Sequence, residues 1–195
     1  GFTLAHSLNF PPEIAAGVIL IGCVPSGLAS NVMSYIANAN VALSITLTAV
    51  ATIVAPIMTP FLMKLLAGEF VQVEFLRMMM DIIKIVILPI GAGLLYNRFL
   101  GGKFPWLDRS MPMLSMVGIA LIITVITAAG RDSLLAVGPL LVLSCLIHNT
   151  AGFVLGYYSC KALKMDEKTC RTIAIEVGLQ NGGVASGLAL QMGRV

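Results

Sequence analysis

The chain has 195 residues, of which 58% are hydrophobic and only 11% are charged, and its mean hydropathy is +0.96. A soluble domain carries about 25% charged residues because it has to present a hydrated surface, so this composition excludes an ordinary water-soluble domain and indicates a lipid bilayer as its partner. The net charge of +3 comes without a run of Lys and Arg that could follow a phosphate backbone, so we expect no nucleic-acid partner.

Six apolar stretches follow one another along the chain, each long enough to cross the roughly 30 Å hydrocarbon core as a helix. Helices are expected because a membrane barrel would need short strands of alternating polarity. The sequence therefore predicts an all-α membrane protein, a multi-helix bundle joined by short connections. The apolar stretches cover residues 12–37, 40–66, 73–96, 111–128, 133–163 and 167–193.

The connections differ in their content of basic residues. Lys and Arg concentrate in 97–110 and 161–171, and the positive-inside rule places these two connections in the cytoplasm. The chain begins with Gly1 and ends at Val195, shortly after a Gly-rich interruption. We expect both ends to be cuts through a longer protein.

Two of the apolar stretches are interrupted by Gly, Pro and polar residues. In 12–37 the interruption reads GCVPSGLASN, where Pro25 removes a backbone donor and the glycines permit irregular dihedral angles. In 167–193 it reads GLQNGG, and Glu176 and Gln180 are predicted to share one helical face at i and i+4. Backbone groups freed at membrane depth need partners in protein, water or a ligand.

The two interruptions also match each other. Aligning Pro25 with Gln180 places Gly27 on Gly182 and the segment LASN on GVAS. Paired interrupted helices in corresponding halves indicate a transporter's binding site, because half-helix ends offer N–H groups to an anion and carbonyls to a cation. A Pro kink with small-residue helix packing explains one such break, but explains two matching breaks poorly.

Glu176 is the residue that points most directly to a ligand. A carboxylate in the middle of a membrane helix costs a few kcal/mol on insertion scales, so it faces a partner or a wet cavity. A bound cation would satisfy it. The alternatives are a protonated structural glutamate and a glutamate near a helix end.

The segments GCVPSGLASNVMSYIANANVALSITLTAVATIVAPIMTP and IEVGLQNGGVASGLAL resemble the signature segments of the bile acid:sodium symporter family, in a bacterial version. The resemblance implies two inverted five-helix repeats, truncated here at both ends, with discontinuous fourth and ninth helices that cross. It places core-domain helices in 1–66 and 133–195, panel-domain helices in 73–128, and the protein in a bacterial inner (plasma) membrane. One departure is Ser26, where the family often has a second glycine.

The same resemblance implies two sodium sites and a substrate cavity. The first site would use Ser30, Asn31, Ser44, Thr48 and Glu176. The second would use Glu176 again, the main-chain carbonyls of Val177 and Leu179, the side chain of Gln180, and a glutamine upstream of Gly1. The substrate cavity would be lined by Ser26, Gly27, Asn181 and Gly182. For Ser44 and Thr48, which are spaced i and i+4, the alternative is a hydrogen bond to the carbonyl four residues earlier in their own helix.

The function implied is sodium-coupled symport of an organic anion, such as a bile-acid-like sterol, pantoate or a keto acid, with no obligate protein partner evident. A proton-coupled transporter using Glu176 is the alternative, and a membrane protein with packing roles alone is another. An intramembrane enzyme is not expected, since H-E-x-x-H, G-x-S-x-G and paired intramembrane aspartates are missing. Elsewhere, we expect His148 and Asn149 to pack rather than line the cavity, and Asp81 to neutralise Lys84.

Overall fold

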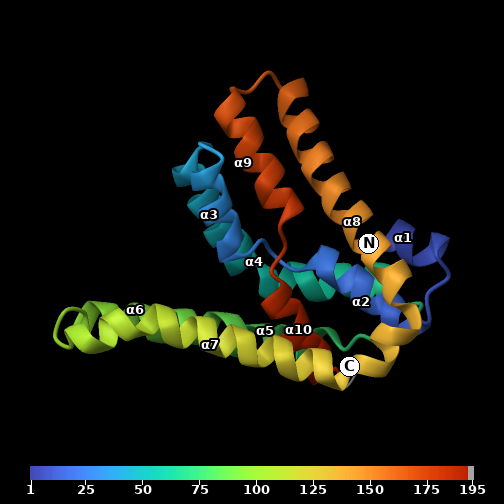
Figure 1. The fold of residues 1–195 in the computed structure, drawn as a ribbon, viewed down its shortest axis with the longest axis horizontal. Coiled ribbons are helices and arrows are strands. Elements are labelled where there is room, and N and C mark those ends of the chain that lie inside the picture. The colour runs from blue at the N-terminus through green and yellow to red at the C-terminus, as the bar shows by residue number, and fades with distance from the viewer. Residues whose placement is uncertain (193–195) are drawn as a thin grey trace.

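The computed structural model describes residues 1–192, which form helices joined by short connections and contain no β-strand (Figure 1). This confirms the predicted all-α class. The helices are α1 (Phe2–Ser7), α2 (Pro12–Cys23), α3 (Leu28–Ile36), α4 (Val41–Ala67), α5 (Phe75–Ile82), the π-helical turn η1 (Ile83–Ile87), α6 (Leu88–Leu100), α7 (Pro105–Ala129), α8 (Arg131–Ala162), α9 (Glu167–Gly178) and α10 (Gly182–Gln191).

Three helical segments are long and apolar enough to cross a bilayer by length and composition: Val41–Ala67, Phe75–Leu100 and Leu134–Ala162. The second is one continuous helix made of α5, η1 and α6, and it extends past the predicted limit at residue 96. Large apolar side chains cover the outer faces of these helices; Ile53, for example, is 70% exposed. Water would disfavour such a surface and hydrocarbon would not, so the chain is an integral membrane protein.

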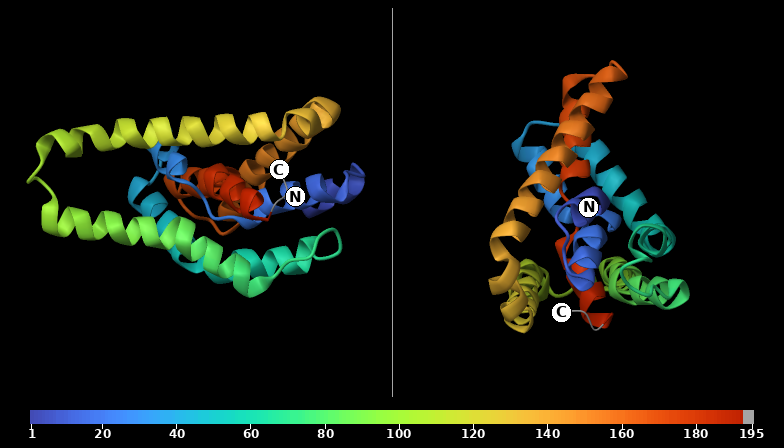
Figure 2. Two further views of the ribbon diagram at one scale, coloured as in Figure 1. Left: turned by 90° about the horizontal axis from the view of Figure 1, so that it is seen from below. Right: turned by 90° about the vertical axis from the view of Figure 1, so that its right-hand side faces the viewer.

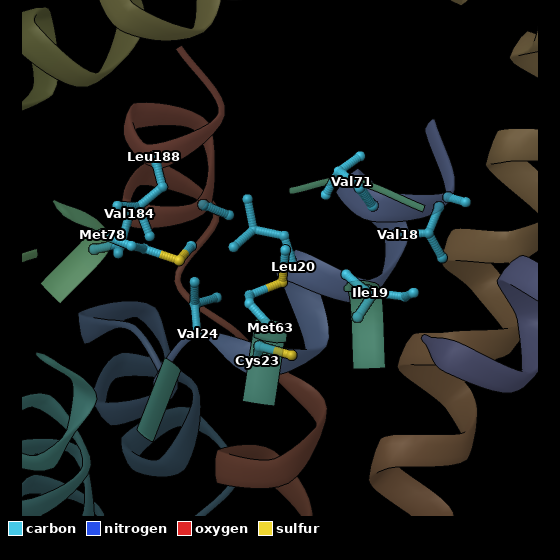
Figure 3. Close-up of a cluster of buried hydrophobic side chains, with 14 of the residues drawn as sticks. Val18, Ile19, Leu20, Cys23, Val24, Met63, Val71, Met78, Val184 and Leu188 are labelled. Carbon is cyan, nitrogen blue, oxygen red and sulfur yellow. The ribbon is translucent and has the colours of Figure 1, made fainter. Parts of the chain in front are cut away.

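The buried core is centred on α2. After Glu13 in its first turn this helix is apolar on all sides, which is typical of a helix surrounded by protein. Ile19 and Leu20 of α2 pack with Met63 of α4, Met78 of α5 and Leu188 of α10 in one cluster (Figure 3). The core therefore joins the first interrupted helix to the segment that follows the second interruption.

Both predicted helix interruptions are confirmed. The first separates α2 from α3, because Pro25 forces the residue before it, Val24, into an extended conformation (φ −80°, ψ 156°). The second separates α9 from α10 at residues 179–181, where Leu179 is extended (φ −111°, ψ 96°). Because α9 ends at Gly178, the prediction that Glu176 and Gln180 share one helical face is wrong: Gln180 lies beyond the end of the helix.

The two interruptions cross and contact each other through their backbones (Figure 1). The Asn181 N–H donates to the Pro25 carbonyl at 2.8 Å, and Ser26 pairs with Gln180 as an isolated antiparallel bridge. Gly27 lies against this contact, and a Cβ atom there would be in ordinary van der Waals contact with Asn181 Cα at 3.4 Å. The crossing therefore brings two segments about 150 residues apart into one place.

The remaining helices flank this crossing. The α5–α6 helix and α7 run on opposite sides of α2 and α10, and α8 and α9 form a separate hairpin (Figure 2). The division into core and panel domains stays a prediction. The predicted ion pair between Asp81 and Lys84 is wrong, because it is not among the described ion pairs. The Asp81 carboxylate faces Gln191 of α10 instead, and the Gln191 amide nitrogen, when turned toward it, donates to its two oxygens at 2.9 and 3.0 Å.

Candidate cation site at the helix crossing

The Glu176 carboxylate lies at the centre of the crossing and is surrounded by hydroxyl groups. Oε2 accepts a hydrogen bond from Ser26 Oγ at 2.6 Å. Oε1 accepts from Ser30 Oγ at 2.6 Å and from Ser44 Oγ at 2.5 Å. Thr48 Oγ1 contacts both carboxylate oxygens at 3.1 and 3.2 Å. Four hydroxyls from three different segments therefore converge on one carboxylate.

The Asn31 side-chain oxygen joins the same cluster. Asn31 Oδ1 accepts from Ser44 Oγ at 2.8 Å and from Thr48 Oγ1 at 3.3 Å. Ser30 and Ser44 are completely buried, and Thr48 is 6% exposed, so these oxygens are shielded from bulk solvent. The structure thus brings together all five residues expected at the first sodium site: Ser30, Asn31, Ser44, Thr48 and Glu176.

Local chemistry explains how each side chain reaches the cluster. Ser30 and Asn31 lie in the first turn of α3, directly after the break at Pro25. Ser44 and Thr48 lie one turn apart on α4, whose N-terminus is capped by the Asn40 side chain accepting from the Leu43 N–H at 3.1 Å. The helix break and the helix cap therefore aim two short segments at the same carboxylate.

The alternative reading of Ser44 and Thr48 as back-bonded helix residues does not hold, because their hydroxyls contact Glu176 and Asn31. The back-bond is made instead by other threonines of the same helix. Thr46 Oγ1 donates to the carbonyl four residues earlier at 2.8 Å, and Thr52 Oγ1 does so at 2.7 Å.

The cluster contains more acceptor contacts than protons. A serine hydroxyl has one proton to donate, yet Ser44 Oγ lies within 2.8 Å of two acceptors, Asn31 Oδ1 and Glu176 Oε1. Thr48 faces the same competition, with both Glu176 oxygens and Asn31 Oδ1 within 3.3 Å. A group of oxygens short of protons, with one net negative charge, is chemically suited to a small hard cation.

The kinds of oxygen atom in the cluster narrow the class of cation that it could bind. Hydroxyl, amide and carboxylate oxygens are ligands of hard cations, whereas zinc and copper prefer His and Cys. Among the side chains that the structure describes, no group of three or more His, Cys, Asp or Glu could hold a metal ion. A single carboxylate with neutral oxygens fits a monovalent cation better than a divalent one, since the charge then balances.

The residues expected at the second sodium site lie directly beside the first, at the end of α9. Gln180 Nε2 donates to the Val177 carbonyl at 2.6 Å, so these two expected ligands bind each other. Leu179 donates its own N–H to the Ile175 carbonyl at 2.9 Å and continues into the extended connection. The expected glutamine lies upstream of Gly1.

The residues expected in the substrate cavity surround the crossing. Ser26 contacts the Glu176 carboxylate, a role that the sequence argument did not assign to it. Gly27 is buried against Asn181, whose Oδ1 accepts from the Val184 N–H at 3.1 Å and caps α10. Gly182 begins α10 and is exposed. The N-terminus of α3, which begins at Leu28 after Gly27, has no side-chain cap, and the Ser30 N–H donates to the Gly27 carbonyl at 3.0 Å.

Sequence reasoning missed the side chains that hold α9 in place. Thr172 is completely buried, and its hydroxyl accepts from the Asn40 N–H at 2.9 Å, linking α9 to the start of α4. Arg171 Nη1 donates to the Ala37 carbonyl at 3.3 Å in the same connection. Thr172 stands four residues before Glu176, but nothing in the local sequence indicates its partner.

Comparison with known proteins identifies the family of this chain. Residues 1–137 match the sodium bile acid symporter family. The chain is 40% identical over 188 residues to an uncharacterized sodium-dependent transporter of Bacillus subtilis (strain 168), YocS, covering 96% of this chain and 59% of that protein. It is 39% identical over 191 residues to the probable chloroplastic sodium/metabolite cotransporter BASS1 of Arabidopsis thaliana, covering 97% of this chain and 47% of that protein.

A third relative is the probable chloroplastic sodium/metabolite cotransporter BASS2 of Oryza sativa subsp. japonica, 37% identical over 194 residues. That match covers 97% of this chain and 45% of the relative, so the chain spans about half the length of the curated relatives it matches. These relatives are described as transporters, not enzymes. On this similarity, the chain belongs to the sodium bile acid symporter family.

Proposed function

We propose that this chain carries the cation site of a sodium-coupled secondary active transporter that moves small organic anions. The observation that supports this most strongly is the Glu176 carboxylate, which accepts from four hydroxyls where two broken helices cross. Two of these hydroxyls, on Ser44 and Thr48, also face the Asn31 side-chain oxygen. The relatives named sodium-dependent transporter and sodium/metabolite cotransporter support the choice of sodium. Of the two expected sites, the cluster at Glu176 is the first.

The origin of the oxygens suggests how sodium and conformation would be coupled. Glu176 belongs to α9, before the second break, whereas Ser30 and Asn31 belong to α3, after the first. An ion held between them would add to the hydrogen bonds by which Ser26 and Ser30 already link the two segments at Glu176. Sodium binding would therefore favour one arrangement of the crossing, as expected for a ligand with different affinities for two states.

The organic anion would bind beside the cation at the two half-helix N-termini. α3 begins at Leu28 without a side-chain cap, and α10 begins at Gly182, which is exposed and follows the capping residue Asn181. N–H groups and the positive end of the helix dipole favour a carboxylate at such a place. Movement of the core against the panel helices would then expose the site to one side of the membrane at a time.

The substrate class remains the carboxylates considered from the sequence: a bile-acid-like sterol, pantoate or a keto acid. The family name points to the first, whereas the Arabidopsis relative is named only as a sodium/metabolite cotransporter. We place the protein in a bacterial inner membrane because of its similarity to the Bacillus protein, although other relatives are chloroplastic.

The test is uptake by proteoliposomes containing the full-length protein, with a radiolabelled carboxylate from each of the three classes. We expect an inward sodium gradient to drive uptake of at least one class, and Glu176→Gln to abolish this uptake. Uptake driven by a pH gradient and indifferent to sodium would instead support the proton-coupled alternative. A transporter in which Glu176→Gln kept full sodium-driven uptake would refute the assignment of the cation site.

A further inference from the structure

The last carbonyl of each interrupted helix segment is held by a side chain from a neighbouring unbroken helix. Gly178 ends α9, and its carbonyl accepts from Asn149 Nδ2 of α8 at 2.9 Å. Cys23 ends α2, and its carbonyl accepts from Thr59 Oγ1 of α4 at 2.8 Å. Because a helix end leaves its final carbonyls without partners inside the helix, each bond satisfies a group that the break itself creates.

The two captured carbonyls occupy matching positions. Aligning Pro25 with Gln180 places Cys23 on Gly178, so the same backbone atom is held in both interruptions. The donors differ in chemistry, a hydroxyl in one case and an amide in the other, and they come from different helices. One such contact would be explained by packing alone. Two at the same position indicate that the geometry of the break requires this carbonyl to be fixed.

The peptides next to Gly178 are also held by side-chain contacts. The Val177 carbonyl accepts from Gln180 Nε2 at 2.6 Å, so two successive carbonyls are held by side-chain amides. α8 also presses directly on this turn: a Cβ atom at Gly152 would lie 3.0 Å from Gly178 Cα and from the Val177 carbonyl oxygen. Asn149 and Gly152 are three residues apart and share a face of α8, so one face supplies both the bond and the contact.

The held turn directly follows Glu176. The carbonyls of Val177 and Leu179, which are the expected ligands of the second sodium site, stand on either side of the Gly178 peptide. The Gly178 carbonyl that Asn149 holds lies between these two carbonyls in the chain. Fixing it limits the dihedral angles available on both sides, at Gly178 and Leu179.

At the first break, the carbonyl held by Thr59 is likewise close in sequence to a residue that contacts Glu176. Thr59 is 1% exposed and anchors the start of the extended connection. Two residues after Cys23, the Pro25 carbonyl accepts from the Asn181 N–H, and the next residue, Ser26, donates to Glu176 at 2.6 Å. A shift of the Cys23 carbonyl would therefore be passed along three residues to the carboxylate.

We propose that Asn149 and Thr59 are positioning residues for the cation site. Each fixes the final carbonyl of a broken-helix segment from outside the site, and together they set the direction in which the oxygens of the crossing point. The inference rests on the proposed sodium site at Glu176. It goes beyond the expectation that Asn149 packs rather than lines the cavity, since its amide holds the turn that follows the carboxylate.

The experiment measures the thermal midpoint of the purified full-length protein as sodium replaces potassium at constant ionic strength. The sodium concentration that gives half of the maximal rise reports affinity, and the midpoint in potassium alone reports stability without the ligand. The variants are Thr59→Val, which removes the hydroxyl at nearly constant shape, Thr59→Ser, which keeps it, and Asn149→Leu. Asn149→Ala replaces Asn149→Leu if the latter does not fold. Thr150→Val, at an exposed position next to Asn149, is the control.

We expect Thr59→Val and Asn149→Leu to raise the half-maximal sodium concentration by roughly fivefold or more, the effect of losing about one net hydrogen bond. Thr59→Ser and Thr150→Val should stay near wild type. Variants that melt earlier by the same amount in both salts, with an unchanged sodium midpoint, would have a packing role only and would overturn the inference. A wild-type protein without any sodium response would overturn the proposed function itself, and this inference with it.

Discussion

The contact between α8 and α9 gives a quantitative prediction about Gly156. A Cβ atom at this position would lie 2.9 Å from Ala174 Cα and from the Ile173 carbonyl oxygen, where ordinary contacts begin at 3.4 Å. Both neighbours are backbone atoms, which cannot rotate aside, so Gly156→Ala must push the helices apart by about 0.5 Å. Overpacking of this kind costs about 1–3 kcal/mol.

Gly118→Ala in the middle of α7 is the control, because nothing lies within 4 Å of the added Cβ atom. Both variants gain the same helix propensity, about 0.5–1 kcal/mol, so the difference between them isolates the cost of overpacking. Thermal unfolding in detergent should place Gly156→Ala below Gly118→Ala by roughly 2–4 °C for each kcal/mol. Equal midpoints for the two variants would refute the close approach of α8 and α9.

Three further predictions concern side chains around the crossing. Thr172→Val removes the buried hydroxyl that accepts from the Asn40 N–H, and should lower the free energy of unfolding by about 1–3 kcal/mol in thermal unfolding. The control Thr46→Val, on the exposed face of α4, should lower it by less than about 0.5 kcal/mol. Ser34 is completely buried, and its hydroxyl has no hydrogen-bond partner in the described chain. Ser34→Ala should therefore leave the thermal midpoint unchanged or raise it, whereas Ser44→Ala should reduce the rise of the midpoint in sodium. An equal reduction of that sodium-dependent rise by Ser34→Ala and Ser44→Ala would contradict this. Hydrogen bonds from the Tyr157 hydroxyl, then from Lys161 and Arg171, hold the pKa of Glu167 below its ordinary value. Because the folded-state pKa is the lower one, this stabilisation is present above the ordinary glutamate pKa and is lost as the pH falls through the folded-state value. Wild type and Glu167→Gln should therefore converge in thermal midpoint at acid pH, and a constant gap down to low pH would exclude this role.

The positions of the helices and of both breaks could be predicted from the sequence because their causes are local. Apolar length determines which segments cross the membrane, and Pro25 forces its neighbour out of helical geometry wherever the helix lies. The convergence of Ser44 and Thr48 on one side of α4 also follows from their spacing. The expected first sodium ligands needed the family resemblance as well, since spacing alone left the back-bonded alternative open.

The contacts between helices could not be predicted, because they depend on how each helix is rotated about its axis. Asp81 and Lys84 have the spacing of an ion pair, yet the packing of α10 brings Gln191 to the Asp81 carboxylate instead. Asn149 carries no local signal for the carbonyl that it holds 29 residues away. Gln180 was misplaced for a different reason: the end of α9 depends on how the backbone crosses the first break.

Equilibrium binding of radioactive sodium to the purified full-length protein is the most direct test of the central claim that the oxygens around Glu176 form a sodium site. We expect the wild-type protein to bind sodium saturably, and unlabelled sodium but not potassium to displace it. We expect Glu176→Gln to lose the binding at the site that Glu176 shares with Ser44 and Thr48. Sodium binding by Glu176→Gln with the stoichiometry and affinity of wild type, or no saturable binding by wild type, would contradict this claim.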